Sequence, residues 1–299
     1  MTAHDWINNQ QQIWAGDTRE RAAHNLNYLN NLNDNLFKNF PDKIMNKFLK
    51  GAGKELPKYD AGAGKFQSAN EGGKLAKMLA LHSSSALVCN VFCYLYNERL
   101  YATLGKALEL DGSISDLDIE VKMKTGLRGI PPHLDVVLYC GDKLYGIESK
   151  FTEPYSGSKN KITMGATSYK EDLWLNKSLP KCAEIVEKIN SGKLKNVFKT
   201  LDVPQLLKHA LGLANNHKSF SLMYLWYEVA GTSESEQHQN EIMEFSKLVG
   251  DEISFRPTSY QKLFSALKTE CAGKHAEYID YLAQRYFPSF PLTSVGRSR

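Results

Sequence analysis

The chain has 299 residues, of which 42% are hydrophobic and 23% are charged, and its formal net charge is +4. This composition is typical of a globular protein with one large or two small domains, and it excludes an intrinsically disordered chain. No apolar run is long enough to cross a membrane, no signal peptide is recognisable, and five irregularly spaced cysteines favour reduced thiols, so we expect a cytoplasmic protein.

Residues 1–50 are polar and predict helices, because four leucines recur there at helical spacing: Leu26, Leu29, Leu32 and Leu36. Residues 51–73 form a loop rich in glycine and lysine. Its two Gly-Ala-Gly-Lys motifs lack the frame of a phosphate-binding loop and follow no strand, so an NTPase is excluded. A contact between this basic loop and a phosphate backbone remains open.

Apolar residues at helical period predict a long helix over 75–104, with a break or cap at residues 82–85. Asp116 to Met123 then alternates between apolar and charged residues, which indicates a strand with Glu120 on its polar face. The turn that follows, residues 126–132, carries Arg128, which is available to a phosphate.

Residues 133–151 read as two strands joined by a two-residue turn at Gly141-Asp142. In that register opposed residue numbers sum to 283, so Val136 faces Ile147 within an apolar face. On the other face Asp135 lies opposite Glu148, and His133 lies opposite Lys150. A slip of one residue would scramble the apolar face, so the pattern itself argues against it.

Two carboxylates so close repel one another, and a divalent cation such as Mg²⁺ would relieve that repulsion. A bound metal activates water and stabilises charge on a phosphoryl oxygen, while a neighbouring ammonium such as that of Lys150 can hold the water or the phosphate. The alternative is a structural ion-pair network in which Lys150 satisfies Glu148.

The next segment, residues 152–181, interleaves five lysines with Tyr155, Tyr169 and Trp174. It is either a solvated surface or a region that grips nucleic acid. A helix over 204–213 carries Gln205, Lys208 and His209, and a buried strand over 220–227 follows. Residues 232–240 suggest an acidic linker, 253–255 a short strand and 278–287 a final helix, and His209 is expected to be a satisfied core histidine.

Asp135, followed thirteen residues later by Glu148-Ser149-Lys150, resembles the signature of the PD-(D/E)xK nuclease superfamily, which includes type II restriction endonucleases. The run 147–155 is similar to restriction endonucleases within it, although His133-Leu134 stands where the name-giving proline would be. The likeness covers roughly residues 71 to 230.

This resemblance implies an α/β (α+β) restriction-endonuclease-like core, with a central mixed sheet flanked by helices and helical N- and C-terminal additions. It divides the chain into residues 1–60, a nuclease-like core over 61–232, and an extension over 233–299 packed on the core.

The implied activity is hydrolysis of DNA phosphodiesters with Mg²⁺, for which Mn²⁺ could substitute. By this likeness Asp135, Glu148 and the carbonyl of Ser149 bind the metal, and Lys150 orients or deprotonates the attacking water. Glu120, before Glu71 or Glu98, is expected to complete the metal shell, and Glu153 to assist. A homodimer would suit the cutting of two strands. The rival interpretations are a non-cleaving module that binds nucleic acid or protein, and a hydrolase of another phosphoester.

Overall fold

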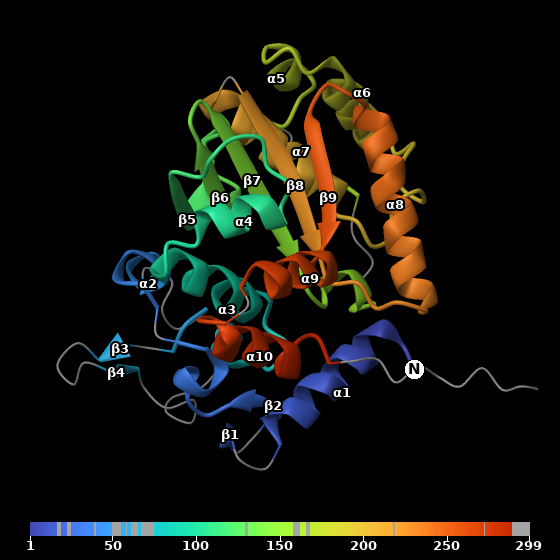
Figure 1. Ribbon diagram of the computed structural model, residues 1–299. Helices are drawn as coiled ribbons and strands as arrows, with labels where there is room; N and C mark the ends of the chain where they lie inside the picture. The colour runs from blue at the N-terminus through green and yellow to red at the C-terminus, as the bar shows by residue number, and fades with distance from the viewer. Residues whose placement is uncertain are drawn as a thin grey trace, which may run out of the picture.

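The computed structural model describes the chain over residues 1–16, 19–22, 25–38, 40–49, 55–57, 59–60, 65–66, 75–128, 131–157, 162–165, 168–217, 219–271 and 273–288. Within these residues the centre of the molecule is a five-stranded sheet in the order β5-β6-β7-β8-β9 (Figure 1). Its strands are β5 (Asp116–Lys122), β6 (His133–Cys140), β7 (Lys143–Lys150), β8 (Ser219–Trp226) and β9 (Ser254–Ser259). The first three run antiparallel and the last three parallel, which makes the sheet mixed.

The hairpin β6–β7 has the predicted register from the turn as far as Val136 and Ile147, but the predicted pairs Asp135–Glu148 and His133–Lys150 are not part of the ladder. Cys140 pairs with Lys143, Leu138 with Tyr145 and Val136 with Ile147, and Gly141 turns the chain with a positive φ of 58°. Only a residue without a Cβ adopts that conformation at no cost. Since a one-residue slip would have exchanged the two faces of β7, this register decides which face of the sheet each side chain of β7 reaches.

Helices cover both faces of the sheet. On one face α7 (Val203–Asn216) packs against β7 and β8. The other face carries α3 (Ser84–Asn97), which contacts β6 and β7, and α9 (Tyr260–Glu270), which contacts β9 and α4 (Tyr101–Ala107). The predicted break before α3 is confirmed: Ser83 caps the helix by accepting a hydrogen bond from the N–H of Ala86.

Further helices in the second half of the chain are α5 (Asp172–Leu175), α6 (Pro180–Asn190), α8 (Ser233–Val249) and α10 (Ala276–Arg285). Residues 232–240 are therefore not a linker, because they begin the long helix α8. Its partner β9 is the fifth strand of the central sheet, so the C-terminal segment completes the sheet. None of the helices within the described ranges has the length and apolar character needed to cross a membrane.

The N-terminal region differs from the helical prediction. α1 (Ala3–Ala15) and α2 (Asp42–Leu49) are helices, but between them lie β1 (Arg21–Ala22), β2 (Asn25–Leu29) and the 3-10 turn η1 (Leu32–Asn35). Leu29, Leu32 and Leu36 are buried, whereas Leu26 is 66% exposed. Their spacing therefore reflects burial of an extended segment and a turn, which helical periodicity does not distinguish.

The short strands β3 (Tyr59–Asp60) and β4 (Lys65–Phe66) and the 3-10 turn η2 (Lys77–Leu79) follow, and a third such turn, η3 (Glu153–Tyr155), lies after β7. Both Gly-Ala-Gly-Lys motifs lie outside the described residues, except for Lys65. The sheet, α1 and α10 share one hydrophobic cluster, which includes Ile7 and Leu282. The architecture is the α/β, restriction-endonuclease-like core that the sequence predicts.

Candidate active site

Asp135 and Glu148 lie where the two strands of the hairpin stop pairing. The backbone ladder between β6 and β7 reaches Val136 and Ile147, and beyond that pair Asp135 Oδ2 accepts a hydrogen bond of 2.6 Å from the N–H of Ser149. The carboxylate therefore replaces a backbone partner at this point. That bond fixes the side chain of Asp135 beside the Glu148-Ser149-Lys150 run.

Glu148 is 2% exposed and lies between two nitrogen groups. Its Oε1 is 2.6 Å from Lys150 Nζ, and its Oε2 is 2.9 Å from His209 Nε2. Burial alone would raise the pKa of Glu148, but the Lys150 ammonium and His209 lower it to about 2. This side chain is therefore a carboxylate at neutral pH.

His209 is fully buried, yet it is not a satisfied core histidine. Its Nε2 lies close to Glu148 Oε2, but the ring is not aligned for a hydrogen bond, and neither of its nitrogens has such a partner among the described residues. Glu148 Oε2 likewise lacks a hydrogen-bond partner. A buried carboxylate oxygen without a donor is rare, because an unmade hydrogen bond costs free energy. It is a feature expected where another ligand belongs.

α7 brings His209 and Gln205 to the site from the opposite side. These residues are one helical turn apart, and Lys150 Nζ donates a hydrogen bond of 3.0 Å to Gln205 Oε1. The helix can lie close to β7 because residue 146 is glycine: a Cβ there would stand 2.5 Å from Leu134 Cδ1 and 3.0 Å from Leu213 Cδ1. Gly212 has a similar role, because a Cβ there would meet Met123. The two glycines together allow α7 to lie close to the sheet.

The Lys150 ammonium is the positive centre of this group. Burial would lower its pKa, but Glu148, Glu153 and Asp135 together raise it above its usual value. Asp135 shows the opposite balance: burial and the charge of Glu148 raise its pKa well above the usual value, although Lys150 and the Ser149 N–H oppose the shift. The two carboxylates therefore repel each other across the end of the hairpin.

Glu120, on β5, lies across from Asp135. The pairs Ile119–Val136 and Val121–Leu134 flank it, but Glu120 itself is unpaired and has a φ of 53°. Its Oε2 is 3.3 Å from His133 Nδ1. Burial raises the pKa of Glu120, His133 opposes this, and the charges of Glu55 and Glu148 add to it. Of the two candidate additional acids that the structure describes, Glu120 and Glu98, Glu120 is the one that lies near Asp135.

The other described candidate is placed differently. Glu98 caps the C-terminal end of α3, about 21 Å along the helix from the Ser84 end, and it is exposed to solvent. The candidate site lies toward the Ser84 end of α3, where Ser84 binds Glu153. Glu98 therefore cannot reach it. Glu71 lies outside the described residues.

In the basic and aromatic segment after β7, Trp174 and Tyr155 are buried, whereas Lys170, Lys177 and Lys181 are exposed. Trp174 is fully buried and donates a hydrogen bond to the Leu207 carbonyl, and Tyr155 is 6% exposed and donates to the Tyr227 carbonyl. These two rings are core residues and do not stack on a ligand. Tyr169 lies 4.9 Å from Lys208 Nζ, and Arg128 is exposed on the turn after β5. Lys159 and Lys161 lie outside the described residues.

Glu153, which the sequence singles out, and Glu55, which it does not, make further contacts near the site. Glu153 accepts from the N–H of Phe151 at 2.8 Å and from the Ser84 hydroxyl, and Glu55 accepts from the Ser85 hydroxyl. Glu55 follows a glycine-rich segment that has no periodicity, so no sequence signal connects it with Glu120. Only the tertiary fold places it there.

The donor set suits a hard divalent cation. Among the described residues no three His, Cys, Asp or Glu side chains are grouped as a complete metal site. Asp135 and Glu148 nevertheless offer carboxylate oxygens beside the main chain of Ser149, and Glu148 Oε2 makes no aligned hydrogen bond. Mg²⁺ typically takes one or two carboxylates and keeps several waters, so two acidic side chains are enough for it.

A comparison with known protein families finds one whose description reads "Restriction Endonuclease associating with ARP", and its model matches residues 2–287. Searches of the curated proteins and of the solved structures gave no significant match. The family match spans nearly the whole chain, including the sheet, α7 and the terminal helices. The chain therefore belongs to this restriction endonuclease family.

Proposed function

We propose that the protein is a metal-dependent endonuclease that hydrolyses DNA phosphodiester bonds. The observation that carries the proposal is the convergence of Asp135, Glu148 and Lys150 at the end of β7, where the buried Glu148 is held by Lys150 and by His209, 2.9 Å from its Oε2. Membership of a restriction endonuclease family supports the reaction class. The PD-(D/E)xK resemblance of the same three residues supports their roles.

Asp135 and Glu148, with the Ser149 carbonyl, would hold Mg²⁺ or Mn²⁺. The bound ion would lower the pKa of a water and stabilise charge on the phosphoryl oxygens. The N–H of Ser149 keeps Asp135 in place, and Glu120 is the acid nearest to complete the shell.

Lys150 would orient the attacking water or hold the phosphate. An ammonium has three N–H donors. Glu148 Oε1 and Gln205 Oε1 each take one of them, which leaves one donor for a substrate oxygen. Because Glu148 favours the charged form of Lys150, this side chain acts as a fixed positive charge, and electrostatic stabilisation of this kind is usually a large part of catalysis.

The test is cleavage of supercoiled plasmid with Mg²⁺, with EDTA and with the variant Lys150→Ala. We expect nicking or cutting that EDTA abolishes and that Lys150→Ala lowers at least 100-fold. Lys143→Ala is the matched control, because Lys143 lies at the far end of the same strand and pairs with Asp111. Full activity of Lys150→Ala, or activity in EDTA, would contradict the proposal.

A non-cleaving binding module is the second candidate. The contacts of Lys150 and His209 with Glu148 also describe an ion-pair network that needs no metal. A plasmid that is retarded in a gel shift but never cut would favour this role. A homodimer would place two sites on the two DNA strands, and sedimentation of the protein–DNA complex would measure it.

A further inference from the structure

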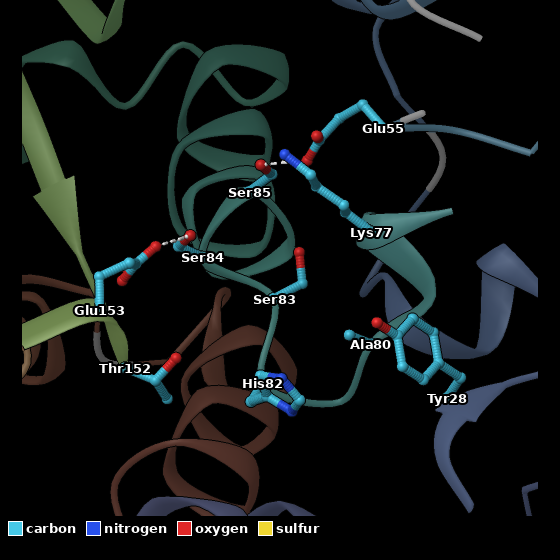
Figure 2. Close-up of a pocket in the computed structure, with 10 residues that line it drawn as sticks. All are labelled: Tyr28, Glu55, Lys77, Ala80, His82, Ser83, Ser84, Ser85, Thr152 and Glu153. Carbon is cyan, nitrogen blue, oxygen red and sulfur yellow. Dashed lines mark hydrogen bonds between the residues drawn. The ribbon is translucent and has the colours of Figure 1, made fainter. Parts of the chain in front are cut away.

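A polar pocket of about 250 Å³ opens beside the proposed active site, between the N-terminal end of α3 and the turn after β7 (Figure 2). Thr152 and Glu153 line one side of it, and Glu55, Lys77 and Tyr28 line the other. Its volume lies below the roughly 300–1,000 Å³ of sites that enclose drug-sized ligands. The pocket therefore suits one small ring system.

The pocket adjoins the proposed active site at the end of β7. Thr152 and Glu153 of its lining follow Lys150 by two and three residues, and Glu153 accepts a hydrogen bond of 2.8 Å from the N–H of Phe151, the residue after Lys150. A ring in the pocket would therefore belong to a group near one held by Lys150.

The charges disfavour a phosphate in this pocket. The N-terminal end of a helix usually attracts anions, but here Glu153 and Glu55 already bind the hydroxyls of Ser84 and Ser85 in the first turn of α3. The pocket lining contains these two carboxylates and one ammonium, that of Lys77, so its negative charges outnumber its positive charge. Burial and the nearby His4 lower the pKa of His82, which keeps its ring uncharged at neutral pH.

The same lining suits a nucleobase. Carboxylate oxygens accept hydrogen bonds from amino and imino groups, serine hydroxyls can donate and accept, and the Lys77 ammonium donates. The pocket lining therefore matches the edge of a base, which carries both donors and acceptors. Tyr28 and His82 add flat rings to the lining, and stacking on aromatic side chains is a common way to hold an unstacked base. Enzymes that take a base out of its stack use pockets of this chemistry.

We propose that this pocket receives one unstacked base of the DNA substrate, from a nucleotide that flanks the phosphate held by Lys150. The proposal rests on the proposed nuclease function, because it needs a polynucleotide at the active site. It assigns substrate reading to residues that are separate from Asp135 and Glu148: Glu55, Glu153 and Lys77 contact the base, and Tyr28 lies against its ring.

The test uses short DNA oligonucleotides, single-stranded and double-stranded, each with 2-aminopurine at one position in turn. They are bound with Ca²⁺ in place of Mg²⁺ to suppress cleavage. We expect a change of about threefold or more in 2-aminopurine fluorescence at one position, and little change at the others. Glu55→Gln, which replaces an acceptor by an amide, should reduce this change at least twofold and weaken binding about 5-fold, the equivalent of one hydrogen bond.

Lys77→Gln is the second variant, because Lys77 is exposed and its replacement leaves the fold intact. Glu187→Gln, on the exposed face of α6, is the control and should change neither signal. Binding with flat fluorescence at every position, or a signal that neither pocket variant reduces, overturns the base pocket and leaves the nuclease proposal standing. Failure of every oligonucleotide to bind overturns both.

Discussion

Glu120 combines a site position with an unusual backbone. A non-glycine residue with a φ of 53° inside a strand costs roughly 1–3 kcal/mol, and such residues cluster at functional sites. The surrounding pairs Ile119–Val136 and Val121–Leu134 hold the strand in register on both sides of it. In this conformation the Glu120 carboxylate lies 3.3 Å from His133 Nδ1, at the start of β6.

We therefore expect opposite effects of two substitutions at this position. Glu120→Gly should keep or raise the free energy of unfolding by up to about 1 kcal/mol, because glycine adopts a positive φ freely. Glu120→Val should lower it by about 2 kcal/mol, because β-branched residues fit that region worst. Urea unfolding measures both, and a Val variant as stable as the Gly variant would show that the backbone is not strained.

At the scale of elements, the position of α7 decides the geometry of the site. This helix delivers Gln205 to Lys150 and His209 to Glu148. It lies against the chain after β5, where a Cβ on Gly212 would stand 2.7 Å from Met123 Cβ and 3.2 Å from the Met123 carbonyl oxygen. Backbone atoms cannot move aside as a flexible side chain can.

Gly212→Ala should therefore destabilise the protein although alanine is the better helix former. Propensity favours the change by about 1 kcal/mol, and overpacking against a backbone typically costs about 1–3 kcal/mol. We expect a net loss of up to about 2 kcal/mol, with reduced cleavage as α7 shifts. Gly105→Ala in α4 is the control, since its Cβ would meet only Ile114 Cδ1 at 3.9 Å. It should be neutral or stabilising in the same thermal unfolding measurement.

The packing of α8 on β8 contains a histidine that will make stability depend on pH. His238 is fully buried, and its ring nitrogens lie 2.8 Å from Thr200 Oγ1 and 2.9 Å from the Tyr224 hydroxyl. Burial lowers its pKa to about 4; Lys150 adds to this and Glu241 opposes it. The unfolded chain, with a histidine pKa near 6.5, therefore binds the proton more tightly than the folded protein does.

The stabilisation by neutral His238 should be complete above about pH 6.5 and lost as the pH falls toward 4. Between pH 7 and pH 4.5 the wild-type protein should lose about 2–3 kcal/mol more than His238→Gln, which cannot titrate. Denaturant unfolding at the two pH values gives this difference. Equal losses in the two proteins would mean that His238 is protonated inside the fold.

The sequence correctly predicts those features that depend on residues close together along the chain. The register of β6–β7 follows from alternation and a glycine turn, and the break before α3 from a serine cap. The helix prediction was wrong for Leu29 and Leu32, because an extended segment followed by a turn can show the same leucine spacing as a helix. The linker prediction was wrong for residues 232–240, because their polarity belongs to the start of α8. The positions of His209 and Glu55 depend on how α7 and the N-terminal region pack, so no local pattern encodes them.

At the scale of the whole molecule, a buried arginine joins the two ends of the chain. Arg285, on α10, is fully buried and donates hydrogen bonds to Gln11 Oε1 at 3.2 Å and to the Asn35 carbonyl at 2.7 Å. It also lies over the ring of Trp14 at 4.0 Å. The guanidinium is held by carbonyl, amide and hydroxyl oxygens and by aromatic rings, and the described residues pair no carboxylate with it.

Arg285→Lys should lower the free energy of unfolding by about 3 kcal/mol, because an ammonium cannot reproduce the planar donor fork and would be left partly unsatisfied. Arg19→Lys is the control: Arg19 stacks on the same Trp14 ring at 3.9 Å but is partly exposed, so its replacement should cost under about 1 kcal/mol. Urea unfolding that shows equal losses for the two variants would refute the role of Arg285 in joining the N- and C-terminal regions.

The measurement that bears most directly on the proposed centre is the plasmid-cleavage rate of Asp135→Asn in Mg²⁺, relative to wild type. Asparagine keeps the shape and can still accept from the Ser149 N–H, so the fold should remain and only the charge is lost. Asp172→Asn, on α5, is the control. We predict a loss of at least 100-fold in rate for Asp135→Asn, with a melting temperature equal to or above that of the wild type because the repulsion from Glu148 is removed, and no loss of rate for Asp172→Asn. A folded Asp135→Asn that cuts at the wild-type rate would contradict the account.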